Sequence, residues 1–418
     1  MPNKIGISMQ GFYGWKVLAS MMVIRGVAGG INLYGSTLFI LPVQDEFKIT
    51  RGIVATVFAA GLVIRNLTSP ISGYLIDRYG AKKMLLLTLF LSSSGYILMI
   101  FAQNIYVFTI IYLALVSLGF HVLLFQAPSV IINNWFDRHK GFSMSLLQVG
   151  AGIGGGILVP ILGYLIAEEG WRFASAMAGL FLLIIGLPIL YIARDTPEEM
   201  NQYPDGIRPK NQSLSGNKSS SGATLKEAIL TRQYWIIVIV LLAFSSAVSA
   251  VAFHFAPILE DKNMSPVTQA GLLGTLAFLS APVIVLTGWL GDRTDKLKVS
   301  AVIIFIIALG IMLLNLGQTV TLMALSALLM AGTQGVYPLL WAVTGDVFGR
   351  RDFGTIRGSI EGIMVFGLAA PSVVGFIYDW QGSYTFALWV SAGLCLGAAA
   401  IAGIASFRSK FTSLFNEL

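Results

Sequence analysis

The chain alternates between long apolar runs and short polar segments. Each run has about 20 residues or more with few charges, which is the length a helix needs to cross a bilayer. The alternating pattern of a transmembrane barrel is absent from the sequence. The pattern therefore predicts an all-α membrane protein with twelve transmembrane helices, at 17–43, 52–76, 84–102, 105–132, 141–166, 172–193, 234–258, 266–290, 299–317, 320–345, 355–377 and 384–406.

The second half of the chain repeats the first at a near-constant offset. A shift of 212 residues carries Phe136 onto Phe348 and Gly163 onto Gly375. Parallel repeats of this kind predict two pseudo-symmetric bundles of six helices with a binding site between them, near the middle of the membrane. We expect an N-terminal bundle at 1–193, a cytoplasmic linker of flexible composition at 194–233 and a C-terminal bundle at 234–418.

Composition and charge agree with a membrane protein. Hydrophobic residues make up 56% of the 418 residues and charged residues only 11%, too little polar surface for a soluble globule. With a cytoplasmic amino terminus, 21 of the 27 Lys and Arg fall in the inner loops and tails. This asymmetry follows the positive-inside rule and predicts a cell-membrane protein with both termini in the cytoplasm. The net charge of +7 therefore reflects topology, and we expect no nucleic-acid partner.

One polar motif follows the second apolar run of each half. The first copy runs from Gly73 to Lys83, and a weaker copy runs from Gly288 to Arg293. Both resemble the cytoplasmic signature loop of the major facilitator superfamily of transporters. The resemblance implies a cytoplasmic gate formed by Gly73, Asp77, Arg78, Gly80, Asp292 and Arg293.

Further segments resemble one branch of that superfamily, the monocarboxylate porters and oxalate/formate antiporters. They are Gly14-Trp15, Trp135-Phe136 to Gly141, 254–257, 348–358 and Tyr378-Asp379 with 382–384. The resemblance covers nearly the whole chain. It implies a secondary carrier, functional as a monomer, that moves a small organic mono- or dicarboxylate by alternating access, with protons as the coupling ion and with no cofactor.

Two positions depart from this branch. Ile284 stands near the place where many relatives carry an arginine that holds the substrate carboxylate, and Tyr34 falls near a lysine of the animal relatives. Either Arg25 or Arg65 has taken over this role, or the cargo is not a simple monocarboxylate.

Both of these arginines lie inside predicted helices. An arginine near the centre of a bilayer costs at least roughly 3 kcal/mol on insertion scales, and its planar guanidinium suits a carboxylate. Arg25 is close enough to the membrane surface for its side chain to extend to the interface instead. Arg65 has a structural alternative too, an ion pair with an inward acidic group.

Other polar residues on apolar helices complete the candidate site. Gln334, Tyr337 and Trp341 share one helical face, although such a stripe is also typical of a packed core. A lone histidine can equally be a packing group, and Glu361 can form a local ion pair with Arg357. We expect proton coupling by His121, His254 and Glu361, and substrate binding by Arg25, Asn32, Tyr34, Arg65, His121, Gln126, His254, Gln334, Tyr337 and Trp341.

Three other functions are weighed against this hypothesis. Efflux of amphipathic drug-like compounds is favoured by the apolar eighth span and by the glycines of 150–156. A substrate sensor without transport is a second rival, although the tails are short. An enzyme is not expected, because the sequence has no metal-ligand cluster and no catalytic spacing of His, Cys or Ser. The glycines themselves predict a close approach of another helix.

Overall fold

The computed structural model describes residues 11–49, 51–208 and 222–407, and these residues are almost entirely helical. The helices that precede the linker run antiparallel to one another in turn along the chain. They are α1 (Gly14–Ala28), continued by η1 (Gly29–Tyr34), η2 (Gly35–Phe39) and α2 (Ile40–Phe47); α3 (Arg51–Tyr79); α4 (Ala81–Leu98) with η3 (Met99–Phe101); α5 (Ile105–Ile111), η4 (Tyr112–Ser117), α6 (Leu118–His121), η5 (Val122–Gln126) and α7 (Ala127–Trp135); and α8 (Lys140–Ile192).

The helices that follow the linker form a second group. They are α9 (Leu225–Ile229), α10 (Arg232–Asp261), α11 (Pro266–Arg293), α12 (Lys296–Leu316), α13 (Val320–Met330), α14 (Thr333–Phe348), α15 (Phe353–Ile363) with η8 (Met364–Ala369), α16 (Ala370–Gln381) and α17 (Thr385–Phe407).

The helices account for twelve passes through a membrane. Ten segments of the described chain are long and apolar enough to cross one. One of these, Lys140–Ile192, contains two helices, because Gly170 has a non-helical φ of 84° and separates them. The remaining pass is α3, whose 29 residues include Arg65 in the middle. The predicted all-α membrane fold of twelve helices is confirmed.

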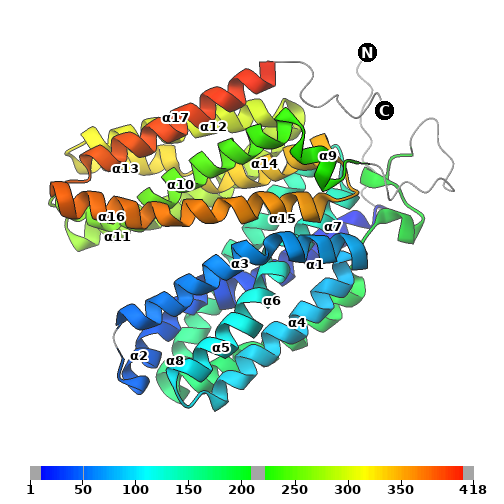
Figure 1. Ribbon diagram of the computed structural model, residues 1–418, viewed down its shortest axis with the longest axis horizontal. Coiled ribbons are helices and arrows are strands. Elements are labelled where there is room, and N and C mark those ends of the chain that lie inside the picture. Colours follow the sequence, from blue (N-terminus) through cyan, green and yellow to red (C-terminus); the bar gives the residue numbers. More distant parts are fainter. Residues whose placement is uncertain (1–10, 50, 209–221, 408–418) are drawn as a thin grey trace.

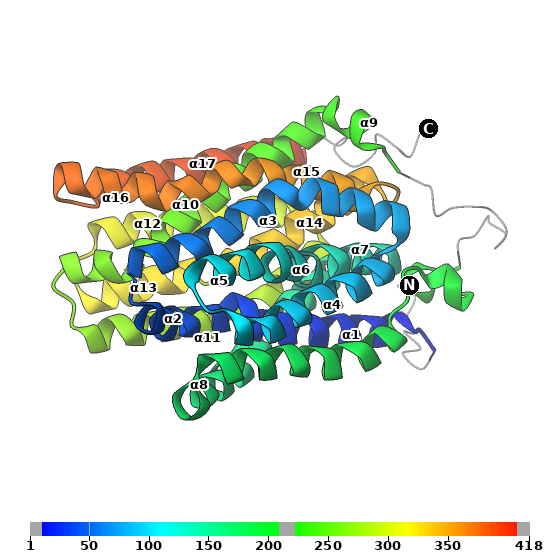
Figure 2. The same cartoon turned by 60° about the horizontal axis from the view of Figure 1, so that its bottom comes forward.

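Buried apolar side chains form two clusters, one on each side of the linker. One cluster draws mainly on residues 17–193 and the other on residues 223–405. Figure 1 shows the two groups of helices, which meet toward the end that holds residues 194–208 and α9 and diverge toward the opposite end. We call these the linker end and the far end. After a turn of 60° the long helices still lie side by side along the same direction (Figure 2).

Glycines allow α1 and α8 to pack backbone against backbone. A Cβ placed on Gly154 would lie 1.8 Å from the carbonyl oxygen of Gly26, and one on Gly30 would lie 2.5 Å from that of Gly154. Helices in lipid associate through small residues of this kind. The predicted close approach at the glycines of α8 is therefore present, and its partner is α1.

Candidate functional site

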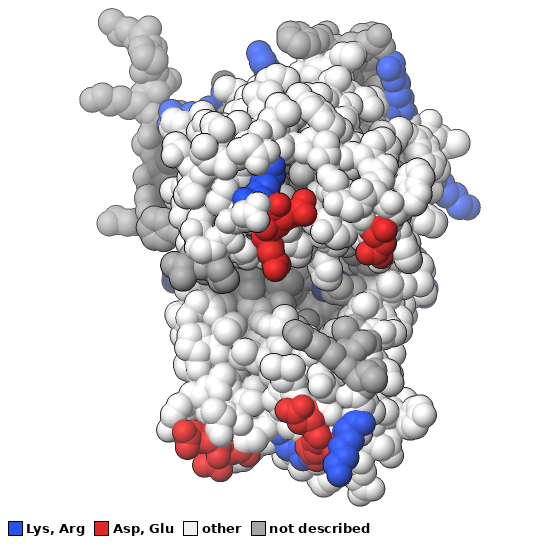
Figure 3. All heavy atoms as spheres, turned by 90° about the vertical axis from the view of Figure 1, so that its left-hand side faces the viewer, with Lys and Arg blue, Asp and Glu red and all other residues white. Residues whose placement is uncertain are grey.

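A cavity of about 1240 Å³ lies between the two groups of helices. Its walls come from α1, η1, α3, α6, η5, α7 and α8 on one side and from α10, α11, α14, α15 and η8 on the other. Seen from the far end, the surface of the molecule is hollowed between its two halves (Figure 3). The cavity is thus the place where both halves of the repeat contribute side chains to one space.

Two guanidinium groups share one aromatic ring in the cavity wall. The central guanidinium carbons of Arg25 and Arg65 lie 5.4 Å and 5.1 Å from the ring centroid of Phe125. Arg25 is only 5% exposed and donates a hydrogen bond to the side-chain oxygen of Gln148, while its Nε has no partner among the described residues. No acidic side chain in the described chain forms an ion pair with either arginine. The two guanidiniums therefore lie in the cavity wall without an acidic partner among the described residues.

A third arginine is neutralised within its own helix. Arg357 is 2% exposed, and its Nε donates to Oε1 of Glu361 at 2.9 Å, one turn further along α15. Its guanidinium also lies over the ring of Trp341, at 4.4 Å from the centroid. The local ion pair considered from the sequence is present.

The other oxygen of Glu361 reaches across to the first group of helices. Its Oε2 accepts a hydrogen bond from Ser69 at 2.7 Å and one from Gln126 Nε2 at 3.3 Å, and His121 Nε2 lies 3.4 Å away. Ser69 and Gln126 are fully buried, and Ser69 also accepts a bond from Gln126 at 2.6 Å. We call Ser69, His121, Gln126, Arg357 and Glu361 the bridging network. It is a buried polar link between the two halves.

The structure brings most of the predicted residues to the cavity wall. Those that line it are Arg25, Tyr34, Arg65, His121, Gln334, Tyr337, Trp341 and Glu361.

Three predicted residues do not line the cavity. Asn32 turns toward Tyr96, with its Nδ2 3.4 Å from the hydroxyl, and Gln126 lies behind the wall in the bridging network. His254 packs within the second group, with Nε2 2.9 Å from the carbonyl oxygen of Pro371 and Nδ1 3.3 Å from the Tyr384 hydroxyl. Both of its ring nitrogens are therefore occupied by contacts between helices, as a packing histidine would be.

Three residues of the site were missed in the sequence. They are Phe125 and Gln148 of the cavity wall and Ser69 of the bridging network. Gln148 shares a helical face with Gly152, Gly155 and Gly156, all of which line the cavity. That spacing was a usable signal for α8. Ser69 carried no comparable signal, because its importance depends on a partner 292 residues away.

Ile284 of α11 lines the cavity at the position where an arginine was sought. Its neighbours on this wall include Leu276 and Pro282, and α11 contributes no cation. The second half of the chain therefore supplies one cavity arginine, Arg357, and supplies it from α15.

The backbone is locally irregular where it borders the site. The π-helical turn η1 carries Tyr34, and the turn η5 carries Phe125 and Gln126 directly after His121. Turns of this type occur frequently at functional sites, because the extra residue in the turn re-aims the side chains that follow.

The signature motifs join the two halves at the linker end. The Asp77 carboxylate accepts hydrogen bonds from the backbone N–H groups of Gly354 and Thr355, at 2.9 and 2.6 Å. In the same way, Asp292 accepts from Gly141 and Phe142, both at 2.7 Å. Each aspartate thus caps the first turn of a helix in the opposite half, α15 or α8, where the helix dipole favours negative charge.

The other predicted gate residues have different surroundings. Gly73 and Gly354 are so close that a Cβ on Gly73 would lie 2.1 Å from the Gly354 carbonyl oxygen. Arg78 donates to the hydroxyl of Tyr74 at 2.8 Å, and Arg293 lies over the ring of Trp289. Gly80 has a φ of 94° and separates α3 from α4. Within the motifs, Asp77, Asp292 and Gly73 make contacts between the halves.

Replacing Asp77 with asparagine is expected to open the linker end. The substitution removes the charge that caps α15. It should destabilise the arrangement with a closed linker end by about 0.5–2 kcal/mol. Spin labels at Tyr79 and Arg351, both exposed, would report a longer mean distance in the variant. Asp295→Asn is the control. Asp295 accepts a hydrogen bond from Lys298 N at 2.8 Å and so caps a helix of its own half. Equal distances in wild type and Asp77→Asn would contradict this role.

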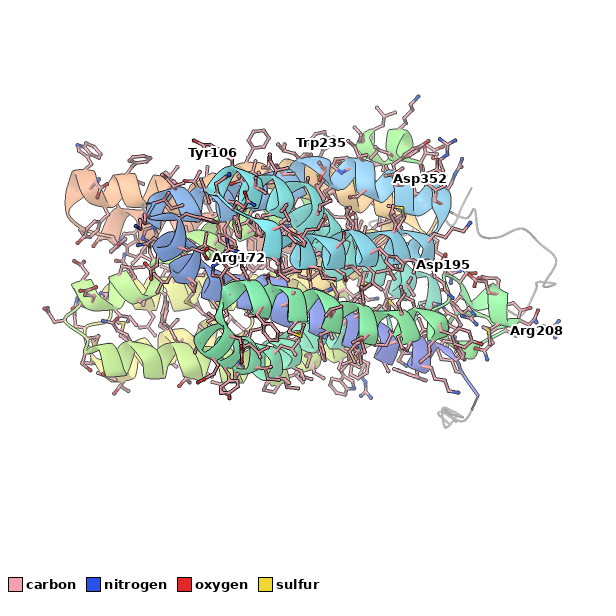
Figure 4. The ribbon with its side chains drawn as sticks, turned by 90° about the horizontal axis from the view of Figure 1, so that it is seen from below. Tyr106, Arg172, Asp195, Arg208, Trp235 and Asp352 are labelled. Atoms are coloured by element: carbon pink, nitrogen blue, oxygen red, sulfur yellow. The ribbon has the colours of Figure 1, made fainter. Side chains whose placement is uncertain are left out.

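A second contact at the linker end depends on pH. Asp205 accepts hydrogen bonds from the backbone of Arg138 at 2.6 Å, and its carboxylate lies 3.0 Å from His139 Nδ1. That hydrogen bond raises the pKa of His139 above its ordinary value. Burial alone would raise the pKa of Asp205, but the bond from His139 and the backbone bonds from Arg138 and Asp137 together outweigh it and hold this pKa below its usual range. Figure 4 shows Asp195, Arg208 and Asp352 at the same end of the molecule.

We expect the anchoring of this segment to weaken as pH rises. Because the folded pKa of His139 is raised, its contribution is complete below about pH 6.5 and is lost as pH rises through the higher folded value. The side chain is 38% exposed, so solvent screening limits the effect to about 0.5 kcal/mol. Hydrogen exchange at the Arg138 amide, corrected for the intrinsic rate, would measure it. His139→Gln should remove the pH dependence, and an unchanged profile in that variant would disprove it.

A bundle of twelve membrane-spanning helices, with one cavity to which both halves contribute side chains, is the architecture of a multi-pass membrane transporter. The family model of the Major Facilitator Superfamily matches residues 22–370. The chain belongs to this superfamily.

Curated relatives indicate which branch of the superfamily this chain resembles. The chain is 23% identical to monocarboxylate transporter 12 of Xenopus laevis, over 96% of this chain and 90% of that protein. It is 24% identical to the uncharacterized MFS-type transporter YcxA of Bacillus subtilis (strain 168), over 71% and 69%. It is 22% identical to the probable sulfoacetate transporter SauU of Cupriavidus necator, over 87% and 86%. The predicted resemblance to the monocarboxylate branch is confirmed.

Solved structures agree with this fold. The proton:xylose symporter XylE bound to 6-bromo-6-deoxy-D-glucose has a TM-score of 0.75 at 13% identity, covering 93% of this chain and 94% of that chain. FucP in the outward conformation has a TM-score of 0.71 at 17% identity, covering 93% and 98%.

Proposed function

We propose that this transporter moves a small organic anion, a mono- or dicarboxylate, across the cell membrane by alternating access. The observation that carries the proposal is the charge of the cavity. Three arginines line it, Arg25, Arg65 and Arg357, against a single carboxylate, Glu361. Cations held away from bulk water are costly without partners, and a guanidinium binds a carboxylate through two parallel hydrogen bonds.

The names of the relatives support this class of cargo. One is called a monocarboxylate transporter and another a probable sulfoacetate transporter. The cargo in each name is an organic anion. The missing arginine of α11 does not weaken the proposal, because Arg25 and Arg65 supply positive charge from the opposite wall.

The contacts between the halves support a conformation that is closed at the linker end. The capping bonds of Asp77 and Asp292 hold the linker end closed, while the surface at the far end is hollowed. We place the linker end in the cytoplasm, in accordance with the distribution of Lys and Arg in the loops. The structure then represents the outward-facing state, and inward opening requires the two aspartate caps to separate.

Proton coupling is the second part of the proposal. Glu361 and His121 are the titratable groups of the bridging network, and the Glu361 carboxylate is bonded to both halves. A proton on Glu361 would remove the charge that attracts Arg357 and one of the acceptors that Ser69 and Gln126 share. Protonation would thus loosen the link that holds the halves together.

Solute counterflow in proteoliposomes tests the proposal. Vesicles that contain the purified protein are loaded with unlabelled lactate, pyruvate, oxalate or succinate, and uptake of the same labelled acid is followed. We expect counterflow with at least one acid and none with lipophilic cations. The competing function is efflux of amphipathic compounds, which the apolar wall at Leu276, Pro282 and Ile284 favours. Counterflow of cations without that of acids would support efflux and overturn the proposal.

A further inference from the structure

We infer that the cargo carries two anionic groups, one for Arg25 and one for Arg65, so that a short dianion is preferred to the matching monoanion. The inference rests on the proposed function and narrows its substrate class. It concerns the wall formed by Arg25, Phe125, Gln148 and Arg65, which we call the arginine wall.

The charges of the cavity lead to this class. Arg357 is compensated by Glu361, through the 2.9 Å bond described above. Arg25 and Arg65 feel the charge of the same carboxylate but form no ion pair with it, and the described lining contains no other acidic side chain. Three arginines therefore stand against one carboxylate, which leaves two positive charges in excess. A monoanion bound to one of them would leave the other guanidinium without a counter-charge, at a cost of several kcal/mol per desolvated ion. A dianion compensates both.

The geometry allows one small molecule to reach both guanidiniums. Since each lies over the same Phe125 ring, their central carbons are at most about 10.5 Å apart. The ring also restricts their positions, because a cation is attracted to the face of an aromatic ring. Gln148 accepts a hydrogen bond from one nitrogen of Arg25, and the buried Nε of Arg25 has no partner among the described residues.

The facing wall suits the hydrocarbon part of such a cargo. Ile284, Tyr337 and Trp341 line the cavity from the second half, and none of them carries a charge. A linear diacid could therefore direct both carboxylates to the arginine wall and its methylene groups to the aromatic and aliphatic side chains.

Matched acids of equal chain length provide the experiment. Thermal shift and counterflow are measured at about pH 7.5, where carboxyl groups are ionised. The pairs are succinate with butyrate and malonate with propionate. We expect the diacid of each pair to half-saturate at a concentration at least about tenfold lower than the monoacid, since each bidentate pair contributes to affinity.

Variants test whether the arginine wall causes the preference for the diacid. Arg25→Gln and Arg65→Gln should each bring the half-saturating concentrations of succinate and butyrate to within about threefold of each other. Arg25→Lys and Arg65→Lys keep the charge and should keep a preference for succinate. Arg208→Gln is the matched control, because Arg208 is exposed at the linker end and outside the cavity lining (Figure 4). Thermal unfolding of each variant shows whether it is folded.

The outcomes separate the two levels of the proposal. If the half-saturating concentrations of butyrate and succinate are equal for the wild type, the dianion inference is overturned and organic-anion transport stands. If the preference survives in both glutamine variants, the arginine wall is not its source and the inference falls. If no organic acid binds or is transported at all, the proposed function itself is overturned.

Discussion

Glu361→Gln is expected to destabilise the protein by about 3–5 kcal/mol, the cost of breaking a buried ion pair by removing one partner. Arg357 is almost fully buried, and Glu361 is the only acidic group that pairs with it in the described chain. The variant leaves that cation without a counter-charge. Thermal unfolding of the detergent-solubilised protein would measure the loss. The double variant Arg357→Gln with Glu361→Gln should recover most of it, because it removes both charges together.

The same two variants test proton coupling. If Glu361 carries the proton, both should lose at least about tenfold of the accumulation that a proton gradient drives, while exchange of solute between the two sides continues. Proteoliposomes with and without an imposed pH gradient separate the two activities. Full gradient-driven accumulation in the double variant would exclude Glu361 as the coupling group. In the thermal unfolding experiment, a Glu361→Gln protein as stable as the wild type would show that Arg357 has another partner.

Gly154→Ala is expected to cause the largest packing defect, about 3 kcal/mol or more. The new Cβ would lie 1.8 Å from the carbonyl oxygen and 2.3 Å from the carbonyl carbon of Gly26. Both atoms belong to the backbone, so no change of rotamer relieves the clash and α1 must move away from α8. We expect a lower unfolding temperature and a poorer yield of monodisperse protein.

The same helix provides the controls for this substitution. Gly152 and Gly156 have no atom within 4 Å of an added Cβ. Because alanine also forms helices better than glycine, Gly152→Ala and Gly156→Ala should leave stability unchanged or raise it by up to about 1 kcal/mol. A Gly154→Ala protein as stable as these two would show that α1 and α8 are not held by this contact.

The sequence predicted the helices well because a bilayer imposes a local requirement. A run of about 20 apolar residues must form a helix to satisfy its backbone hydrogen bonds in hydrocarbon, whatever its neighbours are. The first span was predicted at 17–43, and the structure has a helical segment at Gly14–Phe47. The arginines were also visible, because a charge inside such a run is rare.

The partners of the polar side chains could not be predicted with the same success. His254 was expected in the cavity, yet this residue of α10 packs against Pro371 of α16 and against Tyr384, which directly precedes α17. Asn32 was expected to bind substrate, but it lies in the π-helical turn that begins at Gly29, which changes the period of the helix, and its side chain turns toward Tyr96. Ser69 was not noticed, because a serine in an apolar helix is common and its partner is distant in sequence.

The sequence by itself determined the number of helices, the two signature motifs and the presence of positive charge inside the apolar segments. Those properties depend on composition and on spacing within a single run. Only the tertiary structure decided that Glu361 bonds to Ser69 and that Arg25 and Arg65 share Phe125. The reason is physical: helical periodicity defines the faces of a helix, whereas the contacts of each face depend on how the helices pack together.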